Sequence, residues 1–274
     1  MTSARTAIIG DNCVDAYVSP PLGAAVGGNG VNVAVHLALA GHGADYFGAV
    51  GQDGAGAWIR DSLRRAGVGV DHLVEVPGRT SVTQVAVHGN EREFLSYERG
   101  VGDDYVLQDI DAVTLRVLAG YARIHVVRLA SSVMSGLMAV LDVPISCDLG
   151  PDWAVDAVRG LDVAFASAEG SERSRAADIA RVLVEGGAKV AVVTCGAAGS
   201  VCYDGRRSIA LGAVNCGVID TLGAGDSFIA AFLAGRLENT ELEACVQRGA
   251  TLAAVTCGHL GGWPQELVPL EAVL

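Results

Sequence analysis

The sequence of 274 residues contains almost no lysine, because Lys189 is the only one. A Walker-type phosphate loop needs a Gly-Lys-[Ser/Thr] sequence, so that means of binding a nucleotide is excluded. Any phosphate group would have to be held by backbone N–H groups, arginine or a metal ion. Lysine and arginine together number 19 against 31 acidic residues, a net charge of −12. This charge argues against nucleic acid or an anionic membrane as a partner.

Cysteine pairs and long apolar runs are also lacking. The seven cysteines form no C-x-x-C pair, so we expect free thiols rather than disulfides or a zinc site. No stretch of about 18 apolar residues is free of charges and glycines, which argues against a membrane span. The first residues lack the apolar region of a signal peptide. These features predict a cytoplasmic protein, and the length fits one domain over 1–274.

The most informative stretch that the chain does contain is Asp220-Thr221-Leu222-Gly223-Ala224-Gly225-Asp226, which leads into an apolar run. A glycine-rich turn before a helix directs N–H groups and the positive end of the helix dipole at one point, which makes an anion site. Because a carboxylate at Asp226 would repel that anion, we interpret it as a base that takes a proton from an attacking hydroxyl. The alternative is an acidic N-cap residue on an ordinary helix.

Polar residues also follow the first predicted strand, 6–10, and begin the next helix. Asp11 and Asp15 come at the carboxyl end of this strand, the edge at which open α/β sheets bind ligands. Asn29 and Asn32 lie beside Gly28 in the first turn of a predicted helix with apolar residues at helical spacing. Their amides would hydrogen-bond the hydroxyls of a polyol. The alternative is that Asn29 is a helix cap and Asn32 a solvated surface residue.

The pattern of strands and helices predicts two kinds of sheet. Strands alternate with helices over 123–185, which predicts a parallel sheet with right-handed crossovers. Short alternating strands over 73–97 predict an antiparallel sheet with one open face. Such a sheet does not fit inside a parallel core, so we expect a lid with strands within roughly 12–19 and 72–99. Segments 201–203 and 208–211 flank a turn and predict a hairpin.

The two glycine motifs, Gly27-Gly28-x-x-x-Asn32 and Asp220-Thr221-x-Gly223-Ala224-Gly225-Asp226, resemble the signatures of the ribokinase-like (PfkB) carbohydrate kinases. The resemblance covers nearly the whole chain. It implies an α/β fold, a doubly wound α/β/α sandwich, with a small antiparallel β lid that covers the sugar and often forms a dimer contact. It also implies ATP-dependent phosphorylation of a sugar hydroxyl, with Asp226 as the base and Gly223, Ala224 and Gly225 as an anion hole.

The same resemblance implies roles for further residues. Those that would hold the sugar are Asp11, Asp15, Gly28, Asn29 and Asn32. Arg128, which closes a predicted strand, is a candidate for contacting substrate, or for a structural salt bridge. Those that would contact the nucleotide are Thr194, Gly196, Gly199, Gly225 and His259. The alternative for the glycines at 196 and 199 is an ordinary tight hairpin turn.

One signature of the family is missing. After the strand at 163–165, members usually carry Asn-x-x-Glu, which helps to position Mg²⁺. Here Ser167 stands at the asparagine position and Gly170 at that of the glutamate. Glu169 or Glu172 would substitute, or Mg²⁺ would be held mainly through water and phosphate. The resemblance also implies a monovalent cation such as K⁺ near Asp220.

The predicted substrate class rests on further short motifs. Gly10-Asp11-Asn12-Cys13-Val14-Asp15 and Tyr97-x-x-Gly100-Val101 are most similar to those family members that phosphorylate fructosamines such as fructoselysine at the 6-hydroxyl. Glu98 would meet an ammonium group of such a substrate, or be a solvated lid residue. The alternatives are another sugar or nucleoside kinase, a non-catalytic sugar- or nucleotide-binding protein on the same fold, and, more remotely, a dehydrogenase, whose glycine pattern is incomplete.

Overall fold

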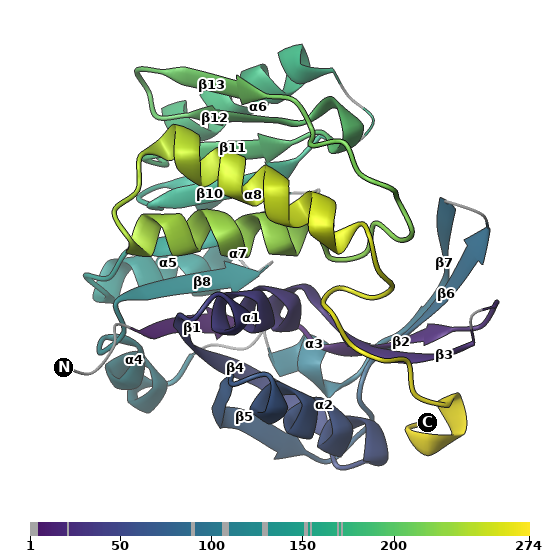
Figure 1. Ribbon diagram of the computed structural model, residues 1–274. Helices are drawn as coiled ribbons and strands as arrows, with labels where there is room; N and C mark the ends of the chain where they lie inside the picture. Colours follow the sequence, from purple (N-terminus) through teal and green to yellow (C-terminus); the bar gives the residue numbers. More distant parts are fainter. Residues whose placement is uncertain are drawn as a thin grey trace.

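Two β-sheets organise the structure, a computed structural model that describes residues 5–20, 22–88, 91–105, 110–127, 131–150, 153, 155–168, 170 and 172–274. The main sheet has nine strands in the order β13-β12-β11-β10-β9-β8-β1-β4-β5, and the small sheet has four in the order β3-β2-β6-β7. Figure 1 shows the small sheet projecting from one side of the main body.

The main sheet is parallel from β5 to β11 and ends in two antiparallel pairings, β11–β12 and β12–β13. Its central strands are short apolar runs because helices cover both of their faces. The predicted hairpin is confirmed as β12 and β13. The strands are β1 (Arg5–Ile9), β4 (Gly43–Gly51), β5 (Gly69–Val76), β8 (Arg123–Val127), β9 (Ile145–Asp148), β10 (Val163–Ser167), β11 (Ala191–Thr194), β12 (Ser200–Tyr203) and β13 (Ser208–Leu211).

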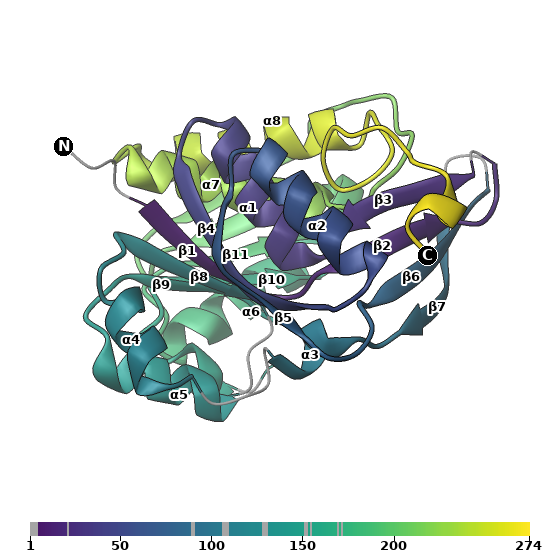
Figure 2. The same ribbon diagram turned by 90° about the horizontal axis from the view of Figure 1, so that it is seen from below.

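Helices form a layer on each face of the main sheet (Figure 2). One layer contains α1 (Asn29–Leu39), α2 (Gly54–Arg65), α7 (Ala224–Leu237) and α8 (Leu242–Thr256). The other contains α4 (Ala112–Leu118), α5 (Ser131–Val140) and α6 (Arg173–Glu185). A separate apolar core fills each interface between sheet and helices. The expected α/β/α sandwich is therefore confirmed. The short helices are α3 (Val101–Tyr105) and the 3₁₀ turns η1 (Val155–Val158), η2 (Gly196–Ala198) and η3 (Leu270–Ala272).

The small sheet is the expected lid, with differences in detail. It consists of β2 (Cys13–Tyr17), β3 (Gly23–Gly27), β6 (Val82–His88) and β7 (Glu91–Glu98). Its β2–β3 and β6–β7 pairings are antiparallel, whereas β2 pairs with β6 in parallel. The sequence did not predict β3, because its small residues are all buried and show no alternation.

The expectation that Leu73–Val76 belongs to the lid was wrong. These residues end β5, which pairs in parallel with β4 at the edge of the main sheet. Leu73 is buried while Val74 and Glu75 are exposed. An edge strand covered incompletely by helices thus shows the same partial alternation as an open-faced lid strand, and the pattern alone does not distinguish the two.

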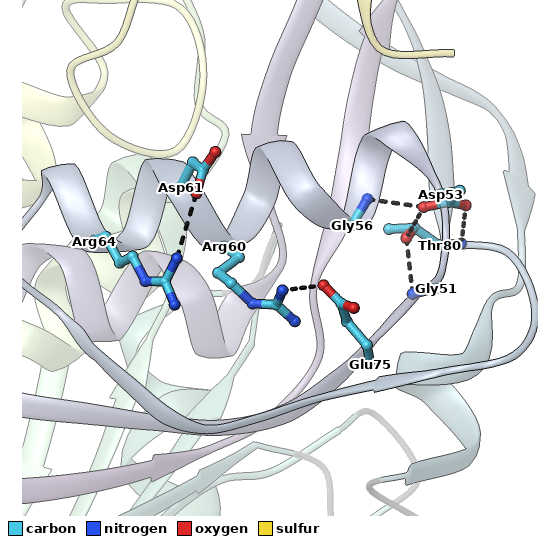
Figure 3. Close-up of polar contacts among 8 residues, drawn as sticks. All are labelled: Gly51, Asp53, Gly56, Arg60, Asp61, Arg64, Glu75 and Thr80. Carbon is cyan, nitrogen blue, oxygen red and sulfur yellow. Dashed lines mark hydrogen bonds and ion pairs between the residues drawn. The ribbon is translucent and has the colours of Figure 1, made fainter.

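The root of the lid is fixed to the start of α2 by Asp53 (Figure 3). The Asp53 side chain accepts hydrogen bonds from the Gly56 amide at 2.8 Å, the Thr80 amide at 2.8 Å and the Thr80 hydroxyl at 2.7 Å. The Thr80 hydroxyl also accepts one from the Gly51 amide at 3.0 Å. Burial acts to raise the pKa of Asp53, but the bonds from Thr80 and Gly56 outweigh it and hold the pKa below its ordinary value.

Two expectations from composition can be compared with the described residues. All seven cysteines are free thiols, and five of them are buried. Within the part of the chain that the structure describes, no helix has both the length and the apolar character that crossing a membrane requires.

Candidate functional site

The glycine-rich turn before α7 has the backbone of an anion site. Gly223 is the N-cap residue and has φ 72°, a left-handed conformation that favours glycine. A Cβ at Gly223 would also overlap the backbone of Gly262. The Ser227 amide makes a hydrogen bond to the Gly223 carbonyl at 2.8 Å. The amides of Gly225 and Asp226 precede this bond in the first turn, where helix N–H groups are available to an anion.

Asp226 is the third residue of α7 and is only 7% exposed. The alternative that it is the N-cap residue was wrong, since Gly223 has that position. The Asn32 side chain donates from Nδ2 to the Asp226 carboxylate at 2.7 Å. The two motifs that the sequence singled out, one at each end of the chain, therefore meet in a direct hydrogen bond.

The way in which α1 begins fixes the position of Asn32. Gly28 is the N-cap residue with φ 105°, and a Cβ there would overlap the backbone of Asp11 and Asn12. The Asp11 carboxylate accepts a hydrogen bond from the Gly30 amide at 3.1 Å. Asn29 is the half-buried first residue of the helix, and Asn32 is 2% exposed. The alternative of a capping Asn29 and a solvated Asn32 was therefore wrong.

Asp15 lies on lid strand β2 and is only 3% exposed. Gly27 passes so close to the Asp15 carboxylate that a Cβ would overlap it. The Cys13 thiol donates to Asp15 Oδ1 at 3.4 Å and accepts from the Thr83 hydroxyl at 3.6 Å. Burial raises the pKa of the Cys13 thiol well above its usual value, which keeps the proton that this bond needs. Neither Cys13 nor Thr83 was predicted for the site, because the pairing of β2 with β6 brings them together.

Asp220 joins three parts of the structure. Its Oδ2 accepts hydrogen bonds from the Tyr17 hydroxyl at 2.6 Å and the Gly261 amide at 3.2 Å. Its Oδ1 accepts one from the Leu222 amide at 2.9 Å. Burial raises the pKa of Tyr17, and the bond to Asp220 raises it further, so the hydroxyl stays protonated and donates. The expected monovalent cation near Asp220 remains a prediction.

The expected nucleotide-contacting residues lie around η2. Thr194 ends β11, and Gly196 and Gly199 have φ 56° and 99°, both of which favour glycine. The Cys195 amide donates to the Gly199 carbonyl at 2.8 Å, which closes a tight turn between β11 and β12. A Cβ at Gly196 would meet open space. His259 follows α8 and donates from Nδ1 to the Leu260 carbonyl at 3.0 Å. Contact of these residues with a nucleotide remains a prediction.

The assignment of metal ligands remains a prediction. Glu172 is exposed and immediately precedes α6. Glu169 and Arg128 lie outside the described residues. Among the residues that the structure describes, no group of three or more His, Cys, Asp and Glu side chains is arranged to hold a metal ion.

Glu98 lies on the lid face opposite to Asp15, and its contact with a substrate ammonium remains a prediction. It pairs with Val82 and lines a cavity of about 430 Å³ together with Gln84, Ala16 and Leu270. Side chains alternate along strands, so this is the face opposite to Asp15, Thr83 and Tyr97, which are paired in register across β2, β6 and β7. The exposed β7 gave no signal in its sequence for which face is the inner one.

A different carboxylate, Asp103 on α3, contacts the inner face of the lid. It accepts hydrogen bonds from the Tyr97 hydroxyl at 2.5 Å, the Ser81 hydroxyl at 2.9 Å and the Gly100 amide at 3.0 Å. The preceding residue, Gly102, packs so closely on Asn12 and β4 that a Cβ would press on both. Asp103 is therefore held near the strand ends that carry Asp11 and Asp15.

Comparison with known proteins agrees with this geometry. Residues 21–265 match the family model described as pfkB family carbohydrate kinase. The fructoselysine 6-kinase of Escherichia coli (strain K12) is 36% identical over 265 residues, which cover 94% of this chain and 98% of that protein. The fructosamine kinase FrlD of Bacillus subtilis (strain 168) is 30% identical over 273 residues, 94% of each chain.

A solved structure shares the fold. The ribokinase of Arabidopsis thaliana complexed with ribose and ATP is 20% identical, with a TM-score of 0.82 over 99% of this chain and 98% of that one. The chain belongs to the pfkB family of carbohydrate kinases and is a phosphotransferase that acts on a sugar hydroxyl.

Proposed function

We propose that the protein transfers the γ-phosphoryl group of ATP to a hydroxyl of a fructosamine such as fructoselysine. The observation that carries this proposal is the buried carboxylate of Asp226 in the first turn of α7. Asn32 on α1 donates a hydrogen bond to this carboxylate, which lies beside the amides of the anion turn. A base next to an anion site is the arrangement that phosphoryl transfer to an alcohol requires.

In the proposed reaction, Asp226 accepts the proton of the sugar hydroxyl as the hydroxyl oxygen forms its bond to the γ-phosphorus. The bond from that phosphorus to the bridging oxygen breaks, and ADP leaves with the electron pair. The amides of Gly225 and Asp226 face the charge that develops on the phosphoryl oxygens. The products are a sugar phosphate, ADP and one proton, which Asp226 releases to solvent.

The sugar would be held by the residues around β2 and the start of α1. Asn32 Oδ1 is buried and has no hydrogen-bond partner within the described part of the chain. A buried acceptor without a hydrogen-bond donor lowers the stability of the folded protein. The hydroxyl of a bound sugar would supply the missing donor. Asp15, Asp11, Gly28 and Asn29 complete the proposed sugar contacts.

ATP would contact Thr194, Gly196, Gly199 and His259, and Mg²⁺ would accompany its phosphates. With one lysine and a net charge of −12, the chain offers little fixed positive charge to offset a triphosphate. Mg²⁺ supplies that neutralisation when bound. The described residues contain no preformed metal cage, which fits an ion held mainly by phosphate and water. Glu172 and Glu169 are the residues we propose to reach it, and K⁺ near Asp220 is a further proposal.

Substrate choice would depend on Asp103. A fructosamine differs from fructose by a cationic amine on C1. Of the two carboxylates, Glu98 lies on the lid face opposite to Asp15, whereas Asp103 contacts the face that carries Asp15 and Tyr97. We therefore assign the amine contact to Asp103, because three hydrogen-bond donors fix the orientation of its carboxylate and so would fix the geometry of an ion pair with the amine.

We also propose that a second copy of the chain contacts the lid, giving a homodimer. Phe94 and Leu95 on the edge strand β7 are neighbouring large apolar side chains that are 55% and 48% exposed, and a contiguous exposed apolar patch is typical of a protein interface. Light scattering on the purified protein should give twice the chain mass of 28.0 kDa. A monomer at micromolar concentration would contradict this.

Steady-state kinetics with ATP test the proposed function. We expect a higher kcat/KM for fructoselysine than for fructose, ribose or adenosine, and loss of turnover in EDTA that excess Mg²⁺ restores. Asp103→Asn should lower kcat/KM for fructoselysine about tenfold and leave that for fructose within about twofold. Asp104→Asn is the matched control, because Asp104 is exposed and pairs with Arg99. A higher kcat/KM for fructose than for fructoselysine would contradict the proposed substrate. Full activity in EDTA would contradict the proposed need for Mg²⁺.

A further inference from the structure

A segment of the C-terminal tail, Gly261-Gly262, lies between the two halves of the site. After α8 the chain runs across α1 toward the lid (Figure 1). A Cβ at Gly262 would overlap the side-chain amide of Asn32, and a Cβ at Gly223 would overlap the backbone of Gly262. One glycine therefore touches both the asparagine that holds the base and the turn that faces the phosphate.

The segment is held on one side by the lid and the anion turn. The Gly261 amide donates to the Tyr17 hydroxyl at 2.9 Å and to Asp220 Oδ2 at 3.2 Å. Gly261 has φ 78°. Two consecutive glycines have the widest backbone freedom of any dipeptide, so contacts on both sides are needed to fix them.

On the other side the segment is held by His36. This side chain lies one turn after Asn32 on the same face of α1 and is 3% exposed. His36 Nε2 is 2.8 Å from the Gly262 carbonyl oxygen. A carbonyl only accepts, so Nε2 carries the hydrogen and donates. Burial lowers the pKa of His36 and outweighs the hydrogen bond to the Gly262 carbonyl, which acts to raise it, and the nearby His259 also lowers it. The lowered pKa favours the neutral ring with a single N–H.

We propose that His36 is a positioning residue for phosphoryl transfer. By holding the Gly262 carbonyl, it keeps the Gly261-Gly262 segment against the Asn32 amide. That amide then has one orientation, in which Nδ2 donates to Asp226 and Oδ1 is presented to the sugar. The role in catalysis rests on the proposed function, whereas the positioning of Asn32 does not.

Kinetics of two His36 variants test the catalytic consequence. In His36→Leu the buried Gly262 carbonyl loses its donor, and we expect kcat to fall about tenfold and the sugar KM to rise several-fold, roughly the cost of a misplaced catalytic group. The ATP KM should stay within about twofold. His36→Gln keeps an N–H at a similar distance and should recover most of the loss. His42→Leu is the control, since His42 pairs with Glu238 outside the site.

The separate effects on kcat, the sugar KM and the ATP KM distinguish a positioning role of His36 from a purely structural one. A smaller folded fraction would lower kcat and leave both KM values unchanged, and that result would overturn the proposal. So would unchanged kinetics in His36→Leu. If His36→Leu does not fold, Gly262→Ala replaces it, because its Cβ displaces the same amide. When Asn32 is also replaced by alanine, the Cβ introduced by Gly262→Ala no longer meets the Asn32 amide. Adding Gly262→Ala to Asn32→Ala should therefore change the sugar KM very little.

An NMR measurement tests the positioning without any turnover. The chain has six asparagines, so the side-chain amide signals are few, and Asn32→Ala identifies the Asn32 pair by its loss. We expect strongly separated proton shifts for this pair in the native protein and in His36→Gln, and averaged shifts in His36→Leu. Identical Asn32 signals in all three proteins would overturn the proposal. A native protein that shows this pattern but phosphorylates none of the sugars would refute the proposed function alone.

Discussion

The Tyr17 hydroxyl donates to the Asp220 carboxylate at 2.6 Å, across 203 residues of sequence. Tyr17 belongs to lid strand β2, and Asp220 opens the glycine-rich turn before α7, so a buried hydrogen bond joins the lid to this turn. Hydrogen bonds to charged groups are among the stronger ones in proteins. The lid and the turn are therefore coupled in position.

Tyr17→Phe should lower the free energy of unfolding by about 1.5–3 kcal/mol, because Asp220 loses a buried donor. Urea unfolding followed by circular dichroism measures this change. Tyr203→Phe, on β12 of the main sheet, is the control and should change stability by less than about 0.5 kcal/mol. Equal stability of Tyr17→Phe and the native protein would show that water replaces the lost hydroxyl.

Asp226→Asn should reduce kcat by about 10²–10⁴, the usual effect of losing a general base, and leave sugar and ATP affinities within a few fold. Initial rates give kcat, and calorimetry gives the two affinities. Asp178→Asn, on the exposed face of α6 where Asp178 pairs with Arg181, should be fully active. If Asp226→Asn keeps more than about a tenth of the native kcat, Asp226 is not the base.

Asn32→Ala should raise the sugar KM strongly and lower kcat, because the sugar and Asp226 both lose a polar partner. The ATP KM should remain nearly unchanged. Asn215→Ala, in the exposed loop before the anion turn, is the matched control. An unchanged sugar KM in Asn32→Ala would remove Asn32 from the sugar site.

Asp53→Ala should lower the free energy of unfolding at neutral pH by about 1–2 kcal/mol, since α2 loses its cap and Thr80 its acceptor. The folded protein holds the pKa of Asp53 below the ordinary 3.8, so its ionised form stabilises the fold above that value. The stabilisation is lost as the pH falls through the folded pKa. The stability difference between the native protein and Asp53→Ala should therefore be constant from pH 7 to 5 and narrow below about pH 4. Asp61→Ala, exposed on the same helix and paired with Arg64, should show no such narrowing.

The sequence predicted those site residues whose chemistry requires a fixed local spacing. The turn from Gly223 to Asp226 and the helix start from Gly28 to Asn32 are of this kind, because their roles depend on successive backbone positions. His36, Tyr17 and Gly262 were not predicted. Their roles come from contacts between segments at opposite ends of the chain, which no short pattern contains.

The lid shows a second physical limit. Alternation has a period of two, so a strand exposed on both faces gives no signal for which set of side chains points inward. This is why the sequence leaves open whether Glu98 on β7 faces a substrate or solvent. The main sheet posed no such difficulty in its centre, since burial on both faces produces the apolar runs that were identified.

The hydrogen bond between Asn32 and Asp226 spans 194 residues, and Gln265 is bonded to Val26 across 239. During synthesis the segment that carries Asn32 is made first, and a nascent chain that ends before Asp220 lacks both the glycine-rich turn and Asp226. Closing such long loops is a late and slow event in folding. We therefore expect activity on refolding to return only when the C-terminal part of the chain has docked against α1.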